Sequence, residues 1–470
     1  MLVPPTTRFW HILAATFLIA ALGCRESDAQ PRPSVTAPAS PTPTEKPTDA
    51  KASAAWPNWR GPTGQGLAAD AILPEKWPTG DVEPLWKSPV AEGWSSPVVD
   101  GGRVFVTDRD GMSERVLAFD ADTGRPLWQR ATPVDFDPHA VGRRHGNGPK
   151  STPVASSGRV YALGIAGLLQ CLDARDGSVV WSVNYPAAFG VREPLPGGRA
   201  YVNREENVIV PIGNGQGAPV PLFGYTGSLA HDGDLLISFV GGGRAGTLVA
   251  FNKQTGDVVW KSLDENVSYS SPVVTTLGGV RQVVTMTGPR VVGLDLADGR
   301  LLWSYPFQIQ YDESIATPAV GDDTVVVTGD GHPLTALRIA KNGDKWSVSV
   351  AWEDDGLSSY LSSPLVNAGR VYGMSNSGEI FCLNIADGKD VWVGGSHGYY
   401  CTPVLAGRQL LCLNERCELE VLATDAAEFR SVASCRLGRG GSWTSPAVVG
   451  SRLYLRTGED LRCVDFSAPR

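Results

Sequence analysis

The sequence predicts an all-β protein, an eight-bladed β-propeller of four-stranded antiparallel blades, and two recurring features predict it. A Ser/Thr-Pro step followed by Val, Ala or Leu returns along most of the chain. A glycine that is followed four residues later by a tryptophan returns between these steps. Self-similarity at a period of roughly 20–50 residues is typical of repeat architectures, in which each copy is one supersecondary unit.

The Ser/Thr-Pro step marks the start of each copy. Consecutive prolines lie 39 to 56 residues apart, except for one gap of 119 residues. In that gap Gly227-Ser228-Leu229 supplies a further copy, with Leu229 in the place of proline. Eight copies result, and the other seven begin at Ser96-Pro97, Thr152-Pro153, Ser271-Pro272, Thr317-Pro318, Ser363-Pro364, Thr402-Pro403 and Ser445-Pro446.

Each copy predicts four short strands. Runs of β-branched and aromatic residues such as Arg103-Val104-Phe105-Val106 alternate with glycine turns, which is the pattern of antiparallel hairpins. The tryptophan after the third strand falls on the outermost strand. The glycine and tryptophan pairs are Gly124 and Trp128, Gly177 and Trp181, Gly256 and Trp260, Gly299 and Trp303, and Gly388 and Trp392.

The ring is expected to close with strands from both ends of the chain. The last copy, 445–466, supplies only three strands, and the segment 83–87 offers the fourth, with Trp86 at the tryptophan position. Such closure removes open sheet edges. Copies five and seven are irregular: Trp346 and Trp352 follow Gly343 out of register, and Phe429 is expected to replace the tryptophan of copy seven.

The first residues predict export and a lipid anchor. Arg8 precedes an apolar stretch, 9–22, that is shorter than the roughly 20 residues of a membrane span. The ending Leu22-Gly23-Cys24 resembles the bacterial lipobox, which implies a signal peptide over 1–23 and a lipid on Cys24. Residues 24–55 are rich in Pro, Thr and Ala and predict a tether, and 56–470 form the propeller.

Composition and motifs exclude several classes of protein. Lys and Arg number 41 against 49 Asp and Glu, a net charge of −8, which argues against a nucleic-acid binder. The run 241–246 matches G-x-G-x-x-G but leads into a strand, so it predicts a hairpin loop. The histidines show no paired spacing, and no G-x-S-x-G motif is present, so neither a metal site nor a hydrolase is predicted.

Aromatic residues recur three positions before the prolines, where one mouth of the ring is expected. They predict a concave surface that binds a flat ligand or an extended segment of a partner. Alternatively, these side chains plug the channel and stabilise the ring. Both interpretations stay open. The eight positions hold Trp94, Lys150, Thr226, Tyr269, Ile315, Leu361, Tyr400 and Trp443, with Tyr225 and Tyr360 adjacent.

A basic loop, 137–150, is expected at the same mouth. It carries Arg143, Arg144, His145 and Lys150 in an otherwise acidic chain. Such a loop predicts either a receptor for an anionic group or acidic partner, or a solvated glycine-rich connection. The longest insertion, 186–225, is expected to flank or cover that mouth.

Seven cysteines remain after Cys24. Cys171, Cys382 and Cys463 occupy one repeat position and predict small buried thiols. The other four belong to copy seven, where an oxidising compartment would permit a disulfide, and Cys412 with Cys417 is the predicted pair. Those four are Cys401, Cys412, Cys417 and Cys435.

The Asp/Asn-x-x-x-Gly-x-x-x-Trp repeat, as in 120–128, resembles the tryptophan-docking repeat of the pyrroloquinoline-quinone (PQQ)-like propeller superfamily over residues 82–466. The opening run 56–62, WPNWRGP, resembles the start of exported PQQ-like proteins of planctomycete type, and its two tryptophans are expected to pack against the propeller wall.

The resemblance implies two classes of function. BamB-like members imply a non-catalytic, lipid-anchored periplasmic module, monomeric, that binds an envelope protein or small ligand at the mouth. It carries no predicted cofactor, and the outer membrane is favoured because Arg25, not Asp, follows Cys24. Quinoprotein members imply a PQQ- and metal-dependent dehydrogenase. The chain departs from that class because it has no Cys-Cys dipeptide and no C-x-x-C-H, although Asp312 and Glu313 could be proposed as metal ligands.

Overall fold

The computed structural model describes residues 55–137, 145–191, 200–203, 208–211, 221 and 223–467, which belong to one compact unit beginning at Ala52. Cys24, the signal peptide 1–23, the tether up to residue 54 and Arg143 lie outside the described residues. Within the described part of the chain, no helix is both long and apolar enough to cross a membrane.

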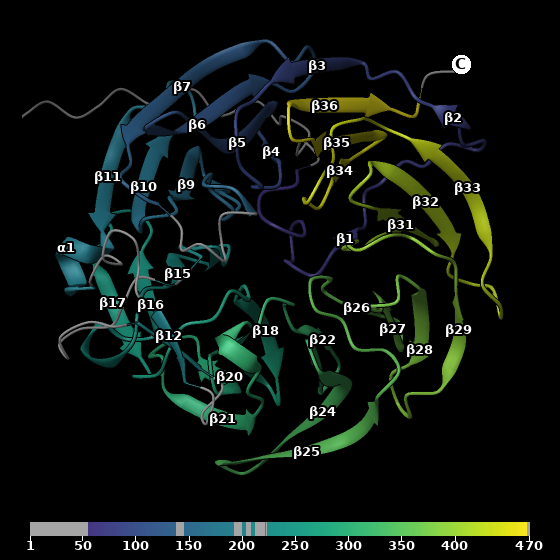
Figure 1. Cartoon of the computed structure of the whole chain (residues 1–470). Helices are drawn as coiled ribbons and strands as arrows, with labels where there is room; N and C mark the ends of the chain where they lie inside the picture. Colours follow the sequence, from purple (N-terminus) through teal and green to yellow (C-terminus); the bar gives the residue numbers. More distant parts are fainter. Residues whose placement is uncertain are drawn as a thin grey trace, which may run out of the picture. The chain divides into compact units, whose positions relative to one another are not determined.

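The described strands include eight successive sheets, here numbered sheet 1 to sheet 8 in chain order, each with four antiparallel strands. In Figure 1 the sheets follow one another around a centre, with their first strands inside and their fourth strands outside. Sheets 1 to 4 contain β4 (Val98–Asp100), β5 (Arg103–Asp110), β6 (Ser113–Asp120) and β7 (Pro126–Pro133); β8 (Val154–Ser156), β9 (Arg159–Leu163), β10 (Leu168–Asp173) and β11 (Val179–Asn184); β14 (Ala230–Asp232), β15 (Leu235–Phe239), β16 (Leu248–Asn252) and β17 (Val258–Ser262); and β18 (Val273–Leu277), β19 (Val280–Met286), β20 (Arg290–Asp295) and β21 (Leu301–Pro306).

Of the remaining four sheets, sheets 7 and 8 also contain strands that precede the repeats in the chain. In sheet 7, β1 (Leu67–Ala68) pairs in parallel with β30 at the inner edge of the sheet. The strand β2 (Gly80–Asp81) pairs in parallel with β33 at the outer edge. In sheet 8, β3 (Trp86–Pro89) is the outer strand, antiparallel to β36. Sheets 5 to 8 otherwise contain β22 (Ala319–Gly321), β23 (Thr324–Gly329), β24 (His332–Asn342) and β25 (Lys345–Asp354); β26 (Leu365–Asn367), β27 (Arg370–Met374), β28 (Ile380–Asn384) and β29 (Asp390–Gly394); β30 (Val404–Ala406), β31 (Gln409–Leu413), β32 (Glu418–Ala423) and β33 (Ser431–Arg436); and β34 (Ala447–Val449), β35 (Arg452–Arg456) and β36 (Asp460–Asp465).

The described residues of the insertion after sheet 2 include a short helix and a pair of strands. The helix α1 (Tyr185–Phe189) is capped by Asn184, whose side chain accepts from the Ala187 amide. The strands β12 (Ala200–Asn203) and β13 (Val208–Pro211) pair with each other, and β13 lies against the 3₁₀ turn Gln310–Asp312 before sheet 5. A second 3₁₀ turn spans Gly243–Ala245.

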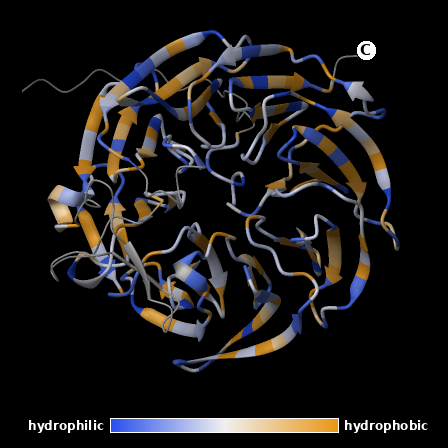
Figure 2. Cartoon of the chain, in the orientation of Figure 1, coloured by the Kyte–Doolittle hydropathy of each residue, from blue (hydrophilic) through white to orange (hydrophobic). Residues whose placement is uncertain are grey.

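Burial explains the sequence pattern of the strands. The first three strands of each sheet are mostly buried, as in β9, whereas the outer strands carry many exposed residues between half-buried ones, as in β7 and β11. Figure 2 shows the resulting alternation of hydrophobic and hydrophilic residues along the outer strands. The apolar faces of neighbouring sheets meet in shared core clusters, which is how single sheets with two apolar faces become stable.

The tryptophans dock between neighbouring sheets. Trp128 stands on Gly177 of the next sheet, where an added Cβ would lie 2.5 Å from its ring, and its Nε1 donates to the Ala174 carbonyl at 3.0 Å. Gly177 has a φ of 70°, so the glycine satisfies both the turn and the close approach. The same Nε1–carbonyl contact is made by Trp86, Trp181, Trp260 and Trp352.

The irregular copies place one tryptophan and correct one expectation. Trp352 takes the tryptophan position of sheet 5, opposite Ala336. In sheet 7 that position is held by Ala433, opposite Val421, so the prediction for Phe429 is wrong. Phe429 precedes β33 and its ring meets Trp392 at 5.8 Å. The turn before β33 has no glycine, and the Trp392 Nε1 is buried without a hydrogen-bond partner among the described residues.

The Ser/Thr-Pro steps join neighbouring sheets through side-chain hydroxyls. The Ser96 amide donates to Thr152 Oγ1 at 3.0 Å, and the Thr152 amide donates to Ser228 Oγ at 3.1 Å. The same contact continues to sheet 6 and joins sheet 8 to sheet 1. The hydroxyls of Thr402 and Ser445 are buried and have no partner in the described part of the chain.

The run that precedes the repeats lies inside the ring, as Figure 1 shows for β1. Trp56 is 1% exposed and exchanges two backbone hydrogen bonds of 2.8 Å with Val99 of sheet 1. The Pro57 carbonyl accepts from Ala155 of sheet 2, and the Gly66 carbonyl accepts from Leu405 of sheet 7. We call residues 56–68 the inner segment, because its backbone binds the inner strands of sheets on opposite sides of the ring.

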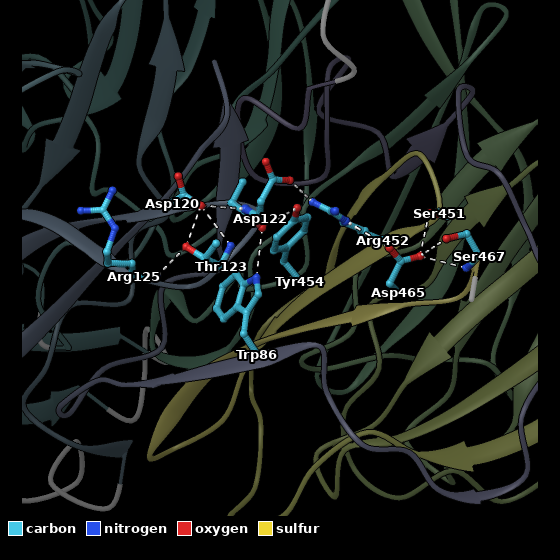
Figure 3. A network of polar contacts seen from close by, with 11 residues as sticks. Trp86, Asp120, Asp122, Thr123, Arg125, Ser451, Arg452, Tyr454, Asp465 and Ser467 are labelled. Atoms are coloured by element: carbon cyan, nitrogen blue, oxygen red, sulfur yellow. Dashed lines mark hydrogen bonds and ion pairs between the residues drawn. The ribbon is translucent and has the colours of Figure 1, made fainter. Parts of the chain in front are cut away.

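The chain then leaves the ring between sheets 7 and 8. Trp77 is 6% exposed, its ring contacts Phe466 at 4.8 Å, and its Nε1 donates to Gln409 at 2.8 Å. Beyond β2 and β3, sheet 8 meets sheet 1 in the polar network of Figure 3. There Trp86 Nε1 and the Tyr454 hydroxyl donate to the Ala121 carbonyl, and Arg452 pairs with Asp122 and Asp465.

Candidate functional site

The residues three positions before the prolines separate into two aromatic groups in the structure. The first, which we call the aromatic patch, lies where sheets 7, 8 and 1 begin and contains Trp94, Tyr399, Tyr400 and Trp443. Tyr399 is 78% exposed and Trp443 is 38% exposed. The Tyr400 and Trp443 rings lie 5.7 Å apart, so Trp443 rests on a buried tyrosine.

The loop that carries the patch is held by one carboxylate. Glu415 Oε2 accepts from the amides of Tyr399 at 3.0 Å and Tyr400 at 3.2 Å, and the Glu415 carbonyl accepts from Ser442 at 2.8 Å. A Cβ added at Gly398, whose φ is 91°, would lie 2.3 Å from Glu415 Oε1. The loops that carry the exposed aromatics of sheets 7 and 8 are therefore both held by Glu415, the first through its carboxylate and the second through its backbone carbonyl.

The second group contains Tyr225, Tyr269 and Tyr360, and its members are mostly occupied by internal contacts. Tyr225 is 2% exposed and its hydroxyl donates to the Val240 carbonyl at 2.6 Å. Tyr269 and His145 both meet Phe223, at 5.2 and 6.1 Å between ring centroids. Tyr360 donates to Glu313 at 2.6 Å. The structure does not bring the predicted aromatics together as one continuous ring, because Tyr225 belongs to the core of sheets 2 and 3.

The described end of the basic loop is built around acidic residues. Gly146 and Gly148 pack on Glu92, where an added Cβ would lie 2.5 Å from its Oε1 and 2.3 Å from its carbonyl oxygen. The Asn147 amide donates to Glu92 Oε1 at 2.6 Å. Burial lowers the pKa of Lys150 to about 8, although Glu92 and Glu114 oppose the shift. Lys150 Nζ donates to the Gly146 carbonyl at 3.2 Å, so this ammonium has an acceptor within the loop.

Glu114 is the buried acid of this region. Its Oε1 accepts from the Ile165 amide at 3.0 Å, and its Oε2 faces Gly164. Burial raises its pKa to about 7, while that amide, Arg109 and Lys150 oppose the rise. Glu114 also lines a cavity of about 180 Å³ between sheets 1 and 2. No sequence pattern marks Glu114, because an acidic residue near the start of a strand is ordinarily exposed.

The proposed metal ligands are used elsewhere. Asp312 is 8% exposed, accepts from Asn266 at 2.9 Å, and burial raises its pKa. Glu313 is the acceptor of Tyr360. Among the described residues, no three side chains of His, Cys, Asp or Glu gather as a metal ion would require.

The cysteines confirm one prediction and correct another. Cys171, Cys382 and Cys463 are buried thiols, each opposite a tryptophan. The predicted Cys412–Cys417 disulfide is wrong: both are free, and they belong to different core clusters. Strand alternation explains this, because Cys412 faces sheet 6 and Cys417 faces sheet 8. Burial raises the pKa of Cys412, and the neighbouring Cys401 thiol raises it further.

Two residues near the patch were not found from the sequence. Tyr399 is the most exposed large apolar side chain in the described residues, and its place beside Tyr400 after a glycine was the available signal. The sequence marks Arg60 only as a member of the opening run 56–62. It is 1% exposed and its Nη2 donates to the Pro364 carbonyl at 2.5 Å, inside the ring.

These features define the class of protein as a β-propeller of tryptophan-docked antiparallel sheets. A family model described as "Outer membrane protein assembly factor BamB" matches residues 77–140 and 113–393, more than half of the chain, so the chain belongs to this PQQ-like, BamB-like family. The resemblance seen in the repeats is thereby confirmed.

Individual relatives agree with the family assignment. The chain is 27% identical over 370 residues to an outer membrane protein assembly factor BamB of Burkholderia pseudomallei, which covers 73% of this chain and 88% of that protein. It is 23% identical over 353 residues to the BamB of Yersinia pestis, covering 70% and 85%.

Solved structures support the fold. The crystal structure of BamB from Moraxella catarrhalis has a TM-score of 0.54 at 15% identity and covers 82% of this chain and 99% of that one. The quinohemoprotein alcohol dehydrogenase ADHIIG from Pseudomonas putida HK5 has a TM-score of 0.55 at 13% identity, covering 89% and 82%. At these identities the likeness concerns the propeller fold alone.

Proposed function

We propose that this protein is a non-catalytic, partner-binding propeller of the bacterial cell envelope and that it binds an envelope protein through the aromatic patch. The observation that carries the proposal is the exposure of Tyr399 and Trp443 on two loops that Glu415 holds, one through its carboxylate and the other through its backbone carbonyl. Exposed aromatic side chains on a rigid support bind partners well, because they bury much apolar surface at a small cost in conformational entropy. The similar proteins of Burkholderia pseudomallei and Yersinia pestis carry the name of an outer membrane protein assembly factor, which supports this class of partner.

The rest of the chain fits such a module. We propose that sheets 1 to 8 are the blades of one eight-bladed propeller, and the antiparallel pairing of β3 with β36 supports closure of its last blade by the N-terminal strand. We also propose a signal peptide over 1–23, a lipid on Cys24 and a tether over 24–55, which hold a monomer at the periplasmic face of the outer membrane. The lipid is the proposed membrane contact.

In-cell photo-crosslinking tests the proposal. A photoreactive phenylalanine is placed at Tyr399, and for comparison at Val179, which is 44% exposed on the outer strand β11. We expect a discrete crosslinked envelope protein from position 399 that is absent from position 179. A Trp443→Ala variant should weaken that band several-fold, because Trp443 belongs to the same patch.

Two outcomes would contradict the proposal. Equal or absent crosslinking at 399 and 179 would remove the aromatic patch as the partner surface. Saturable binding of PQQ with Ca²⁺ that raises the melting temperature would favour the quinoprotein alternative, because a ligand that binds the folded state stabilises it.

A further inference from the structure

A cavity of about 220 Å³ lies inside the ring beside the inner segment. The backbone of the inner segment binds sheets 1, 2 and 7, through Val99, Ala155 and Leu405. The cavity lies between this segment and β14 and β18, the first strands of sheets 3 and 4. Figure 1 shows β18 on the inner side of its sheet. The lining of this one space therefore comes from three separate parts of the chain.

Part of the lining is apolar. It includes the ring of Trp59 from the inner segment and, from sheet 4, Pro272 and Val273. The Arg60 guanidinium carbon lies 5.6 Å from the centroid of the Trp59 ring, and this cation–π contact helps to hold the indole in place. A half-buried indole offers a flat apolar surface to a ligand.

The polar part of the lining carries little free charge. Thr63, Gln65 and Thr275 contribute hydroxyl and amide groups. Of the described residues that line the cavity, Arg281 alone is permanently charged. Its Nε donates to Asp232 Oδ2 at 2.8 Å, so the charge of Arg281 is paired outside the cavity lining.

His231 lines the cavity as a neutral imidazole. Burial lowers the pKa of His231, the charge of Lys253 lowers it further, and Asp232 opposes the shift. A neutral imidazole has one N–H donor and one acceptor nitrogen. His231 Nδ1 and the Oδ1 of Asn58, another lining residue, have no hydrogen-bond partner within the described ranges. Both side chains therefore keep hydrogen-bonding capacity for a ligand.

The cavity between sheets 1 and 2 is similar in volume, about 180 Å³, but differs in chemistry. Its lining includes the charged side chains of Glu114, Arg115 and Asp135. The cavity beside Trp59 combines an indole with uncharged hydroxyl, amide and imidazole groups. A multiply charged ligand does not suit it, because burying an unpaired charge is costly. Its lining matches a neutral ligand that has both an apolar face and hydroxyl groups.

We propose that the cavity beside Trp59 binds one neutral sugar ring. Such a ring presents C–H groups on its faces and hydroxyl groups around its edge, which match the indole and the polar side chains of the lining. The volume suits a single ring, since it lies below the roughly 300–1,000 Å³ of sites for drug-sized ligands. The source is either a free monosaccharide or the terminal residue of a glycan, and this inference does not depend on a protein partner.

Saturation-transfer difference NMR on the full chain tests the proposal with glucose, galactose and mannose as probes. We expect a saturable response to at least one of them with a Kd of about 1 mM, which is typical of a ligand of about a dozen non-hydrogen atoms. The uronate of the same sugar adds a carboxylate to the ring and should bind about tenfold more weakly.

The methyl glycoside of the bound sugar distinguishes the two sources. Retained binding of the glycoside identifies a glycan terminus as an accepted source. Loss of binding restricts the site to the free monosaccharide.

Variants assign the response to the cavity. Trp59→Ala removes the apolar surface and should raise the Kd about tenfold. Thr275→Trp fills the cavity and should abolish the response. Thr132→Trp is the matched control, because Thr132 is a half-buried strand threonine that lines the cavity between sheets 1 and 2, and its Kd should equal that of the native chain.

The proposal is overturned if no sugar of the panel gives a saturable response, if the uronate binds as well as the neutral sugar, or if Thr275→Trp keeps the native Kd. Should Thr275→Trp not fold, an unchanged Kd in Trp59→Ala overturns it instead. A sugar response together with absent crosslinking at position 399 supports this site and contradicts the proposed partner surface, so the two proposals fail separately.

Discussion

The contacts between sheets 1, 2 and 3 differ from those on the two sides of sheet 7. In the first region each tryptophan stands on a glycine of the next sheet, and each Ser/Thr-Pro step accepts a hydrogen bond from the step before. Around sheet 7 the turn glycine and the tryptophan are missing, and the Thr402 and Ser445 hydroxyls lack partners among the described residues.

The segment before the repeats compensates for these losses. It adds β1 to the inner edge of sheet 7, Trp77 between sheets 7 and 8, and β2 to the outer edge. The comparison teaches that the repeat motif supplies the interface wherever its residues are intact. Where the motif has decayed, a segment without repeat character supplies buried apolar surface and backbone pairing in its place.

The largest expected effect is at Trp77. Trp77→Ala should lower the free energy of unfolding by about 3–5 kcal/mol, because it removes a buried tryptophan where the repeat provides none. Chemical denaturation measures the loss. Trp346→Ala, at a partly exposed tryptophan in the extension of β25, is the control and should cost clearly less. Equal costs would mean that the segment does not replace the missing docking contact.

A glycine pair within sheet 2 sharpens the account of the regular interface. Gly177 and Gly158 have φ values of 70° and 73°, but only Gly177 meets a tryptophan. Gly158→Ala should cost about 1 kcal/mol from backbone strain alone. Gly177→Ala adds a clash with Trp128 and should cost about 2 kcal/mol more. Equal denaturation midpoints for Gly158→Ala and Gly177→Ala would contradict tryptophan docking as the source of this interface's stability.

The pH dependence of stability should arise from the regular region. The pKa of Glu114 is about 7 in the folded chain against an ordinary 4.5, so its contribution is fully present below pH 4.5 and is lost as pH rises through 7. Lys150, with a pKa of about 8, stays protonated below pH 7 in both states. Glu114→Gln should therefore flatten the fall in unfolding free energy between pH 5 and 8 by about 2–3 kcal/mol.

Denaturation of the native chain and of Glu114→Gln at both pH values measures this effect. Arg60→Met at the inner segment should leave the fall unchanged, because the pKa of Arg60 is about 10. A native-like fall in Glu114→Gln would assign the pH dependence to other groups.

The smallest expected effect compares two threonines of the Ser/Thr-Pro steps, each 1% exposed. Thr152→Val leaves the Ser96 amide without its acceptor and should cost about 1–2 kcal/mol. Thr402→Val removes a hydroxyl that accepts from no amide of a neighbouring step and should cost clearly less. A similar cost at both positions would erase the difference between the two regions.

The sequence predicted the parts of the fold that depend on repetition. Pro97 and its equivalents marked the inner strands, and Trp86 marked the strand that pairs with β36, because these residues occupy recurring positions. Phe429 was misassigned because a repeat pattern gives no information where its residues have been replaced. The course of the inner segment could not be predicted, since Arg60 and Gly66 contact residues more than 300 positions away in the chain.

The candidate site was predicted in part for the same reason. Trp94, Tyr400 and Trp443 followed from their spacing to the prolines. Their separation from Tyr225 depends on how one tyrosine packs in the core of sheets 2 and 3, and the role of Lys150 depends on two carboxylates from other strands. Neither contact leaves a pattern in the local sequence.

Native-state hydrogen exchange of the inner segment tests the central claim, that this segment is an integral part of the ring. The Trp56 amide donates to Val99 and the Gly66 amide to Arg60, while Ala155 and Leu405 donate back to the segment. We predict that peptides covering 56–68 exchange as slowly as those covering β8. Exchange of 56–68 within seconds at neutral pH, with β8 still protected, would contradict the account.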